Sequence, residues 1–123
     1  MRKLILMILL LGFCLLPSSA FAATNVTFVW DPNREPDMHE YRLYQSPVSG
    51  QYTFGEGDEV ATISHPKNTI TIPVEDGTWY WVLTALDTSG NESGPSNEVT
   101  ATIDSIPPVP PKGLKITVIV HIQ

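Results

Sequence analysis

The sequence contains few residues whose type and spacing could carry out chemistry. Its three histidines, His39, His65 and His121, lie in separate segments, and no His/Cys pair has the short spacing that zinc ligands need. The serines are not part of a Gly-x-Ser-x-Gly turn, which presents the nucleophile of many hydrolases. We therefore expect that the protein is not an enzyme and that it needs no cofactor.

Carboxylates are the most abundant groups that could bind a ligand. Of the 13 acidic residues, five lie in two segments rich in turn-forming residues: Asp31, Glu35, Asp37, Asp87 and Glu92. Calcium takes six to eight oxygen ligands, so these five are candidate calcium ligands. Both segments lack the regular Asp-x-Asp-x-Asp-Gly spacing of a calcium loop. Carboxylates that bond to their own turn backbones explain the pattern more simply, so we assign no metal site.

The first 22 residues have the pattern of a secretory signal peptide. Arg2 and Lys3 form a positive start, residues 4–16 are apolar, and a small-x-small pattern ends at Ala22. The apolar run is shorter than the roughly 20 residues that span a bilayer. We expect cleavage after Ala22 and a secreted or periplasmic protein of bacterial type, with a retained N-terminal anchor as the alternative.

The chain that remains after cleavage is acidic and has no cysteine. Arg2, Lys3 and Cys14 all belong to the signal peptide, which leaves five basic residues against 13 acidic ones. Nucleic acid and anionic lipid are bound through clustered Lys and Arg, so we expect neither as a partner. About 100 residues are enough for one domain, which must hold together by core packing without disulfides.

The pattern of apolar residues predicts short β-strands and no helix. The expected strands cover residues 25–30, 40–46, 68–74, 79–86 and 96–103, with shorter ones around Tyr52 and Val60 to Ile63. The predicted core is Trp30, Tyr41, Leu43, Ile70, Ile72, Trp79, Trp81, Leu83 and Ala85. Trp30 is expected to be nearly fully buried. Tyr44, Tyr52 and Tyr80 are expected on an exposed face, as a contact patch or, more simply, as cross-strand pairs.

Together these segments resemble a fibronectin type III domain in its compact secreted bacterial form. The resemblance covers about residues 26–103 and rests on Trp30, “YRLY” at 41–44, “DGTWYW” at 76–81, “VLTALD” at 82–87 and “SGNESGPSNEV” at 89–99. It implies a fibronectin-type-III-like (immunoglobulin-like) β-sandwich with sheets A-B-E and C′-C-F-G. Members of this family mostly bind or space other molecules, which implies a non-catalytic interaction or assembly module.

The chain departs from the family pattern in two places. Only seven residues separate the predicted cleavage site from Trp30, where the family has a whole strand, so strand A is expected to be missing. The family's corner tyrosine falls on either Trp79 or Tyr80, and Trp79 fits the inward alternation better.

The resemblance also implies an alternative function. It places the loops 31–37 and 87–93 at one pole of the sandwich, where they would form a binding surface. The alternative is therefore a ligand-binding module for a surface protein or glycan.

A strand-like tail follows the domain. Residues 23–105 are the predicted sandwich, 106–112 a proline-rich linker and 113–123 a C-terminal β-strand, which we call the tail. Five apolar residues of the tail share one face: Leu114, Ile116, Val118, Val120 and Ile122. Such a segment aggregates when left unpaired. It either covers an edge of its own sandwich, or enters the empty strand-A position of a second molecule, or waits for another partner.

Processing of the signal peptide gives the first prediction. Exported protein should begin at Ala23, and its intact mass measures this directly. A mass that still includes Met1 would contradict cleavage and support the retained N-terminal anchor instead.

Overall fold

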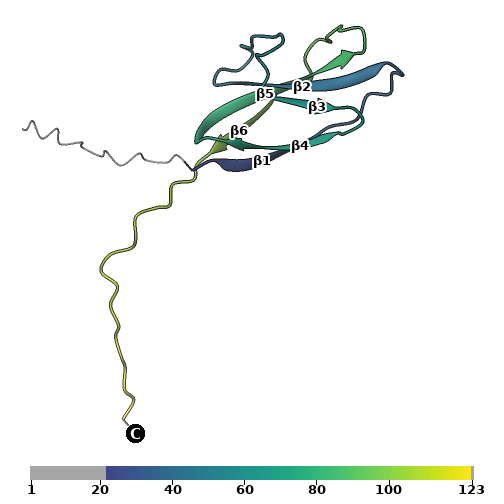
Figure 1. Cartoon of the computed structure of the whole chain (residues 1–123). Helices are drawn as coiled ribbons and strands as arrows, with labels where there is room; N and C mark the ends of the chain where they lie inside the picture. The colour runs from purple at the N-terminus through teal and green to yellow at the C-terminus, as the bar shows by residue number, and fades with distance from the viewer. Residues whose placement is uncertain (1–21, 123) are drawn as a thin grey trace, which may run out of the picture.

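The computed structural model describes residues 22–122, which contain six β-strands and no helix (Figure 1). The strands are β1 (Thr24–Val29), β2 (Met38–Ser46), β3 (Ala61–Ser64), β4 (Thr69–Val74), β5 (Gly77–Asp87) and β6 (Val99–Ile103). Apart from Ala22, the predicted signal peptide lies outside the described residues.

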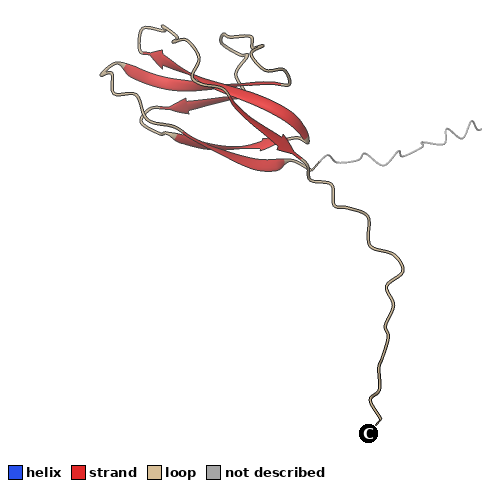
Figure 2. Ribbon diagram, turned by 180° about the vertical axis from the view of Figure 1, so that it is seen from behind, coloured by secondary structure: helices blue, strands red, loops and turns tan. Residues whose placement is uncertain are grey.

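The strands form two antiparallel sheets of unequal size. The larger sheet has the order β3-β2-β5-β6, and the smaller one contains only β1 and β4. Figure 2 shows the two sheets as separate layers, as in a β-sandwich. The long central pair, β2 with β5, runs in register from Met38 opposite Asp87 to Ser46 opposite Tyr80, with one irregularity next to Met38. Aromatic and β-branched residues fill both strands and suit this pleated surface.

Side chains of the two layers meet in one apolar core. Trp81 and Tyr41 are each 1% exposed, and Leu43, Ile63 and Val74 are buried with them. The other predicted core residues pack against this cluster and are partly buried: Trp30, Ile70, Ile72, Trp79, Leu83 and Ala85. The predicted core did not include Ile63 and Val74. The sequence does indicate Val74, because it continues the alternation of Ile70 and Ile72.

Aromatic contacts join the layers. The ring of Phe28 in β1 meets Trp81 edge-on, with centroids 5.2 Å apart. Trp30 meets Tyr41 in the same way at 5.1 Å. Edge-to-face pairs add to the stability that burial of the rings provides. Trp30 itself follows β1 and is only partly buried, so the expectation that it would be nearly fully buried is wrong.

The outer face of the larger sheet is covered by loops. Tyr44 is 1% exposed, because Phe54 of the loop after β2 packs edge-on against its ring at 4.9 Å. Val82, Thr84 and Leu86 are also buried on this side. The expectation that Tyr44 would lie on an exposed face is therefore wrong, and Tyr52, expected in a short strand, lies in the covering loop.

The corner before β5 is made by Trp79. Its indole Nε1 donates a hydrogen bond to the carbonyl oxygen of Glu75 at 3.0 Å, which bonds the start of β5 back to the preceding turn. Gly77 in this turn has φ of 139°, a conformation that favours glycine. The side-chain hydrogen bond to this turn therefore comes from Trp79.

Core packing gives the second prediction. Trp81→Ala should lower the free energy of unfolding by about 3–5 kcal/mol, a large part of the roughly 5–15 kcal/mol that a domain has in total. Trp30→Ala should cost less, because Trp30 is only partly buried. Urea denaturation of both variants tests the order. An equal or larger loss for Trp30→Ala would contradict this description of the core.

Candidate functional site

The smaller sheet has only two strands, so the outer edges of β1 and of β4 are both unpaired among the described residues. β1 pairs with β4 from Thr24 opposite Val74 to Val29 opposite Thr69, and no other residue within 22–122 pairs with the opposite edge of β1. The backbone N–H of Trp30 donates to the carbonyl of Asn68, across the β1–β4 pair. In an antiparallel pair, every second residue directs its N–H and C=O to the partner strand.

The alternate residues of β1 therefore point their backbone groups outward. These are Asn25, Thr27 and Val29, whose N–H and C=O groups face the open edge. The side chains of Thr27 and Thr71 bond at 2.7 Å, as expected for the closer side chains of a non-hydrogen-bonded pair. An added strand would find three residues ready to exchange backbone hydrogen bonds.

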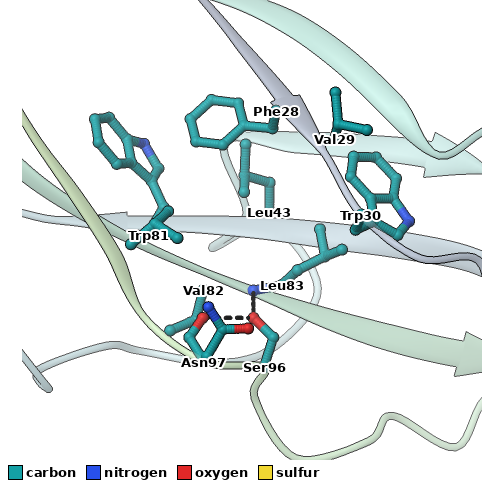
Figure 3. A pocket seen from close by; sticks show the side chains of 10 residues that line it. Phe28, Val29, Trp30, Leu43, Trp81, Val82, Leu83, Ser96 and Asn97 are labelled. Carbon is teal, nitrogen blue, oxygen red and sulfur yellow. Dashed lines mark hydrogen bonds between the residues drawn. The ribbon is translucent and has the colours of Figure 1, made fainter.

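A hollow lies beside this edge, between the smaller sheet and β6. It has a volume of about 120 Å³ and is lined by ten residues, of which only Ser96 and Asn97 are polar (Figure 3). The apolar ones include Phe28, Trp30, Leu43, Trp81, Leu83 and Val99. We call it the β1–β6 groove. Apolar cavities of roughly 150 Å³ accept a benzene-sized group. The groove therefore has room for an apolar side chain from an added strand.

The groove exists because the smaller sheet, with two strands, covers only part of the larger sheet, which has four. β4 lies near β3, and Phe28 of β1 packs on Trp81 of β5. The remaining strand of the larger sheet, β6, is left without a strand opposite it among the described residues. Val99 at its start is accordingly 45% exposed, although it lies on the inward face.

The tail is not a strand in this structure. Residues 104–122 form no secondary structure and run away from the sandwich (Figures 1 and 2). The predicted pairing face is almost fully exposed: Leu114 98%, Ile116 89%, Val118 74%, Val120 75% and Ile122 93%. The prediction of a β-strand over 113–123 is thus not met here. A strand requires a partner for its backbone groups, and the tail lies away from its own sandwich.

The linker leaves the sandwich beside the start of β1. The hydroxyl of Ser105 donates to the carbonyl of Ala22 at 3.4 Å and to Asp76 at 3.0 Å. The end of β6 and the start of β1 therefore lie at the same pole. Because residues 113–122 are exposed and form no secondary structure, we expect the sandwich to keep its packing when the tail is removed.

The acidic loops meet at the other pole, as expected. The N–H of Thr88 donates to the carbonyl of Asp37 at 2.9 Å, which joins the loop before β2 to the loop after β5. Glu35, Asp37, Asp87 and Glu92 line a hollow of about 240 Å³ there, whereas Asp31 lines a different one. Within residues 22–122, no three His, Cys, Asp or Glu side chains gather to hold a metal ion.

Two of these carboxylates have local partners. Asp87 accepts hydrogen bonds from the backbone N–H of Ser89 and Asn91, each at 2.9 Å, and from the side chain of Asn91. Glu35 accepts from the side chain of Asn33 at 3.3 Å. Hydrogen bonds from Asn91 hold the pKa of Asp87 below its usual value. The geometry thus favours turn-stabilising carboxylates over calcium ligands.

Glu92 contacts polar side chains on the covered outer face of the larger sheet. It accepts hydrogen bonds from the hydroxyls of Tyr44 and Thr84, and Arg42 pairs with it at 3.3 Å. Burial alone would raise the pKa of Glu92, but these hydrogen bonds and the Arg42 charge outweigh it and lower the pKa. Burial, and then the bond to Glu92, raises the pKa of Tyr44.

A second carboxylate, Glu98, joins two loops. It accepts hydrogen bonds from the hydroxyls of Ser49 and Tyr52, both at 2.6 Å, and from the backbone N–H of Gly50 at 2.8 Å. The sequence did not indicate Glu98, because its partners lie almost 50 residues away. The loops that Glu92 and Glu98 hold in place cover the outer face of the larger sheet.

No protein-family model and no curated protein matches the chain. Residues 22–122 contain no helix that could cross a membrane.

The Glu92 contacts give the third prediction, a dependence on acid. The folded pKa of Glu92 lies below its usual value of 4.5, so this carboxylate stabilises the fold above that pH and ceases to do so as the pH falls through its folded pKa. Glu92→Gln should melt at a lower temperature than the wild type at pH 7, and the difference should shrink toward pH 3. Thermal melts across this range measure it. Glu75→Gln, a change at an exposed carboxylate, is the control. A constant difference at all pH values would contradict the assignment.

Proposed function

We propose that this chain is a secreted, non-catalytic interaction module with a fibronectin-type-III-like sandwich, and that it binds by accepting a β-strand at the open edge of β1. The strand orders β1-β4 and β3-β2-β5-β6 support the fold type. They correspond to B-E and C′-C-F-G of the family, and no strand within residues 22–122 fills the position of strand A beside β1. The corner hydrogen bond of Trp79 agrees with the same assignment.

The observation that carries the proposal is the unprotected edge beside an apolar groove. Proteins usually protect an edge strand with charged residues, proline or a covering segment. β1 reads TNVTFV, with neither charge nor proline, and no described residue covers its outer edge. Strand addition suits such a site, because backbone hydrogen bonds supply affinity and alternate side chains enter pockets.

The partner should be an extended segment that is apolar on alternate residues. Its inward side chains would face Phe28, Leu83 and Val99 in the β1–β6 groove. The acidic balance of the chain further disfavours an acidic partner. The protein acts after export, in the periplasm or outside the cell, where its partner is a surface protein or another copy.

The alternative, ligand binding by the pole loops, has weaker support. The oxygens of Asp87 and Glu92 are engaged by their own loops and by the sheet. A protein or glycan that bound there would have to compete with these hydrogen bonds.

Peptide selection gives the fourth prediction and separates the two functions. A random ten-residue peptide library, selected against the chain truncated after Lys112, should yield peptides with alternating apolar residues. Their binding should shift the NMR signals of the Asn25, Thr27 and Val29 amides.

Thr27→Pro should abolish this binding, because it removes an outward N–H without breaking the bonds to β4. Thr71→Ala removes the same Thr27–Thr71 side-chain bond and should leave binding intact. Peptides that instead shift residues 31–37 and 87–93 would support the alternative and contradict strand addition.

A further inference from the structure

We infer that the strand received at β1 is the tail of a second copy of this chain, running antiparallel to β1, so that molecules join head to tail. This inference rests on the proposed function and names its partner.

The tail has the composition that the edge requires. From Leu114 onward it contains no proline, and from Ile116 onward it contains no Asp, Glu, Lys or Arg. Its five alternate apolar side chains share the face that would turn toward the groove, while the intervening face carries Lys115, Thr117, Ile119 and His121. The segment 114–122 is longer than β1, which has six residues. It can therefore pair along the full length of the open edge.

A parallel arrangement within one chain places the wrong residues at the edge. The linker leaves from Ser105 beside the start of β1, so the first residues along β1 would be 106–112. This linker spans about 22 Å as polyproline, at ~3.1 Å per residue, whereas β1 spans only about 20 Å. The proline-rich linker, which lacks most N–H donors, would occupy the edge, and the apolar tail would lie beyond its end.

In an antiparallel arrangement within one chain, the linker is too short to run along β1 and then reverse direction. The tail would have to begin beyond Val29, at the far end of β1. The linker would then run straight along the whole of β1, about 20 Å, and no residues would remain for the reversal except Gly113. Five residues, Pro107 to Pro111, include four prolines and resist such a bend.

A second copy meets neither obstacle. The tail extends away from its own sandwich, as Figure 1 shows, and can approach a neighbour's β1 from its far end. Its β-strand would then have the antiparallel sense. Donor and acceptor surfaces are different parts of the chain, so the contact is head to tail and builds open chains.

Complementation between two defective variants is the fifth prediction and tests the inference. The full chain from Ala23 should form concentration-dependent oligomers in analytical ultracentrifugation. Thr27→Pro, which disables the acceptor edge, and Val118→Lys, which disables the donor face, should each weaken association more than tenfold. A mixture of the two variants should form dimers and nothing larger, because one intact edge and one intact tail remain. Thr117→Lys, with the same added charge on the other face of the tail, should still assemble.

Strand direction has its own readout. A nitroxide attached to Lys115→Cys of a donor should broaden amide signals near Val29 of the acceptor, because the start of the tail lies at the end of β1. Broadening near Thr24 would overturn the antiparallel sense.

Three other outcomes would overturn the inference. They differ in whether the proposed function, strand addition at β1, is overturned with it. Strictly monomeric wild type, together with peptides that bind the β1 edge, would mean that strand addition is real but its partner is not this tail. Thr27→Pro protein that assembles as well as the wild type would mean that tails associate with each other. Failure of both the assembly and the peptide selection would overturn both proposals.

Discussion

The contact between Phe28 and Trp81 holds the two sheets together and determines where the sandwich is open. Trp81 is almost completely buried, and its indole N–H donates to the side chain of Gln45 at 2.9 Å. With Phe28 packed on it at 5.2 Å, β1 lies over β5. The groove and the open edge are thus consequences of one packing arrangement, in which a two-stranded layer is centred on a four-stranded one.

The outer face of the larger sheet is covered by loops that polar contacts hold in place. Glu92 binds Tyr44, Thr84 and Arg42 on the outer face of the larger sheet, and Glu98 ties the loop after β2 to the segment before β6. Buried hydroxyls need such partners, since an unsatisfied one costs about 1–3 kcal/mol. These contacts do not cover the outer edge of β1, which lies next to the apolar residues of the β1–β6 groove.

Much of the strand pattern could be predicted from the sequence because the side-chain period of a strand is local. The alternation in residues 79–86 placed Trp79, Trp81, Leu83 and Ala85 on one face, and these four lie against the core. Burial of the opposite face could not be predicted in this way. Tyr44 is covered by Phe54 and bonded to Glu92, which lies far away in the chain. Trp30 is partly exposed and follows β1, whose outer edge pairs with no strand within residues 22–122.

The sequence by itself determined most of the strands of the sandwich, their inward faces, the absence of a cysteine framework and the apolar alternation of the tail, since each follows from residue type and short-range spacing. It did not determine whether residues around Tyr52 or in the tail form strands. Only the tertiary structure decided that β1 leaves Asn25, Thr27 and Val29 facing outward, that a hollow lies beside them, and that the linker departs from the pole where β1 begins. These three features depend on how the layers are stacked and on which strand ends share a pole. They arise from contacts between residues distant in the chain, which no local pattern records.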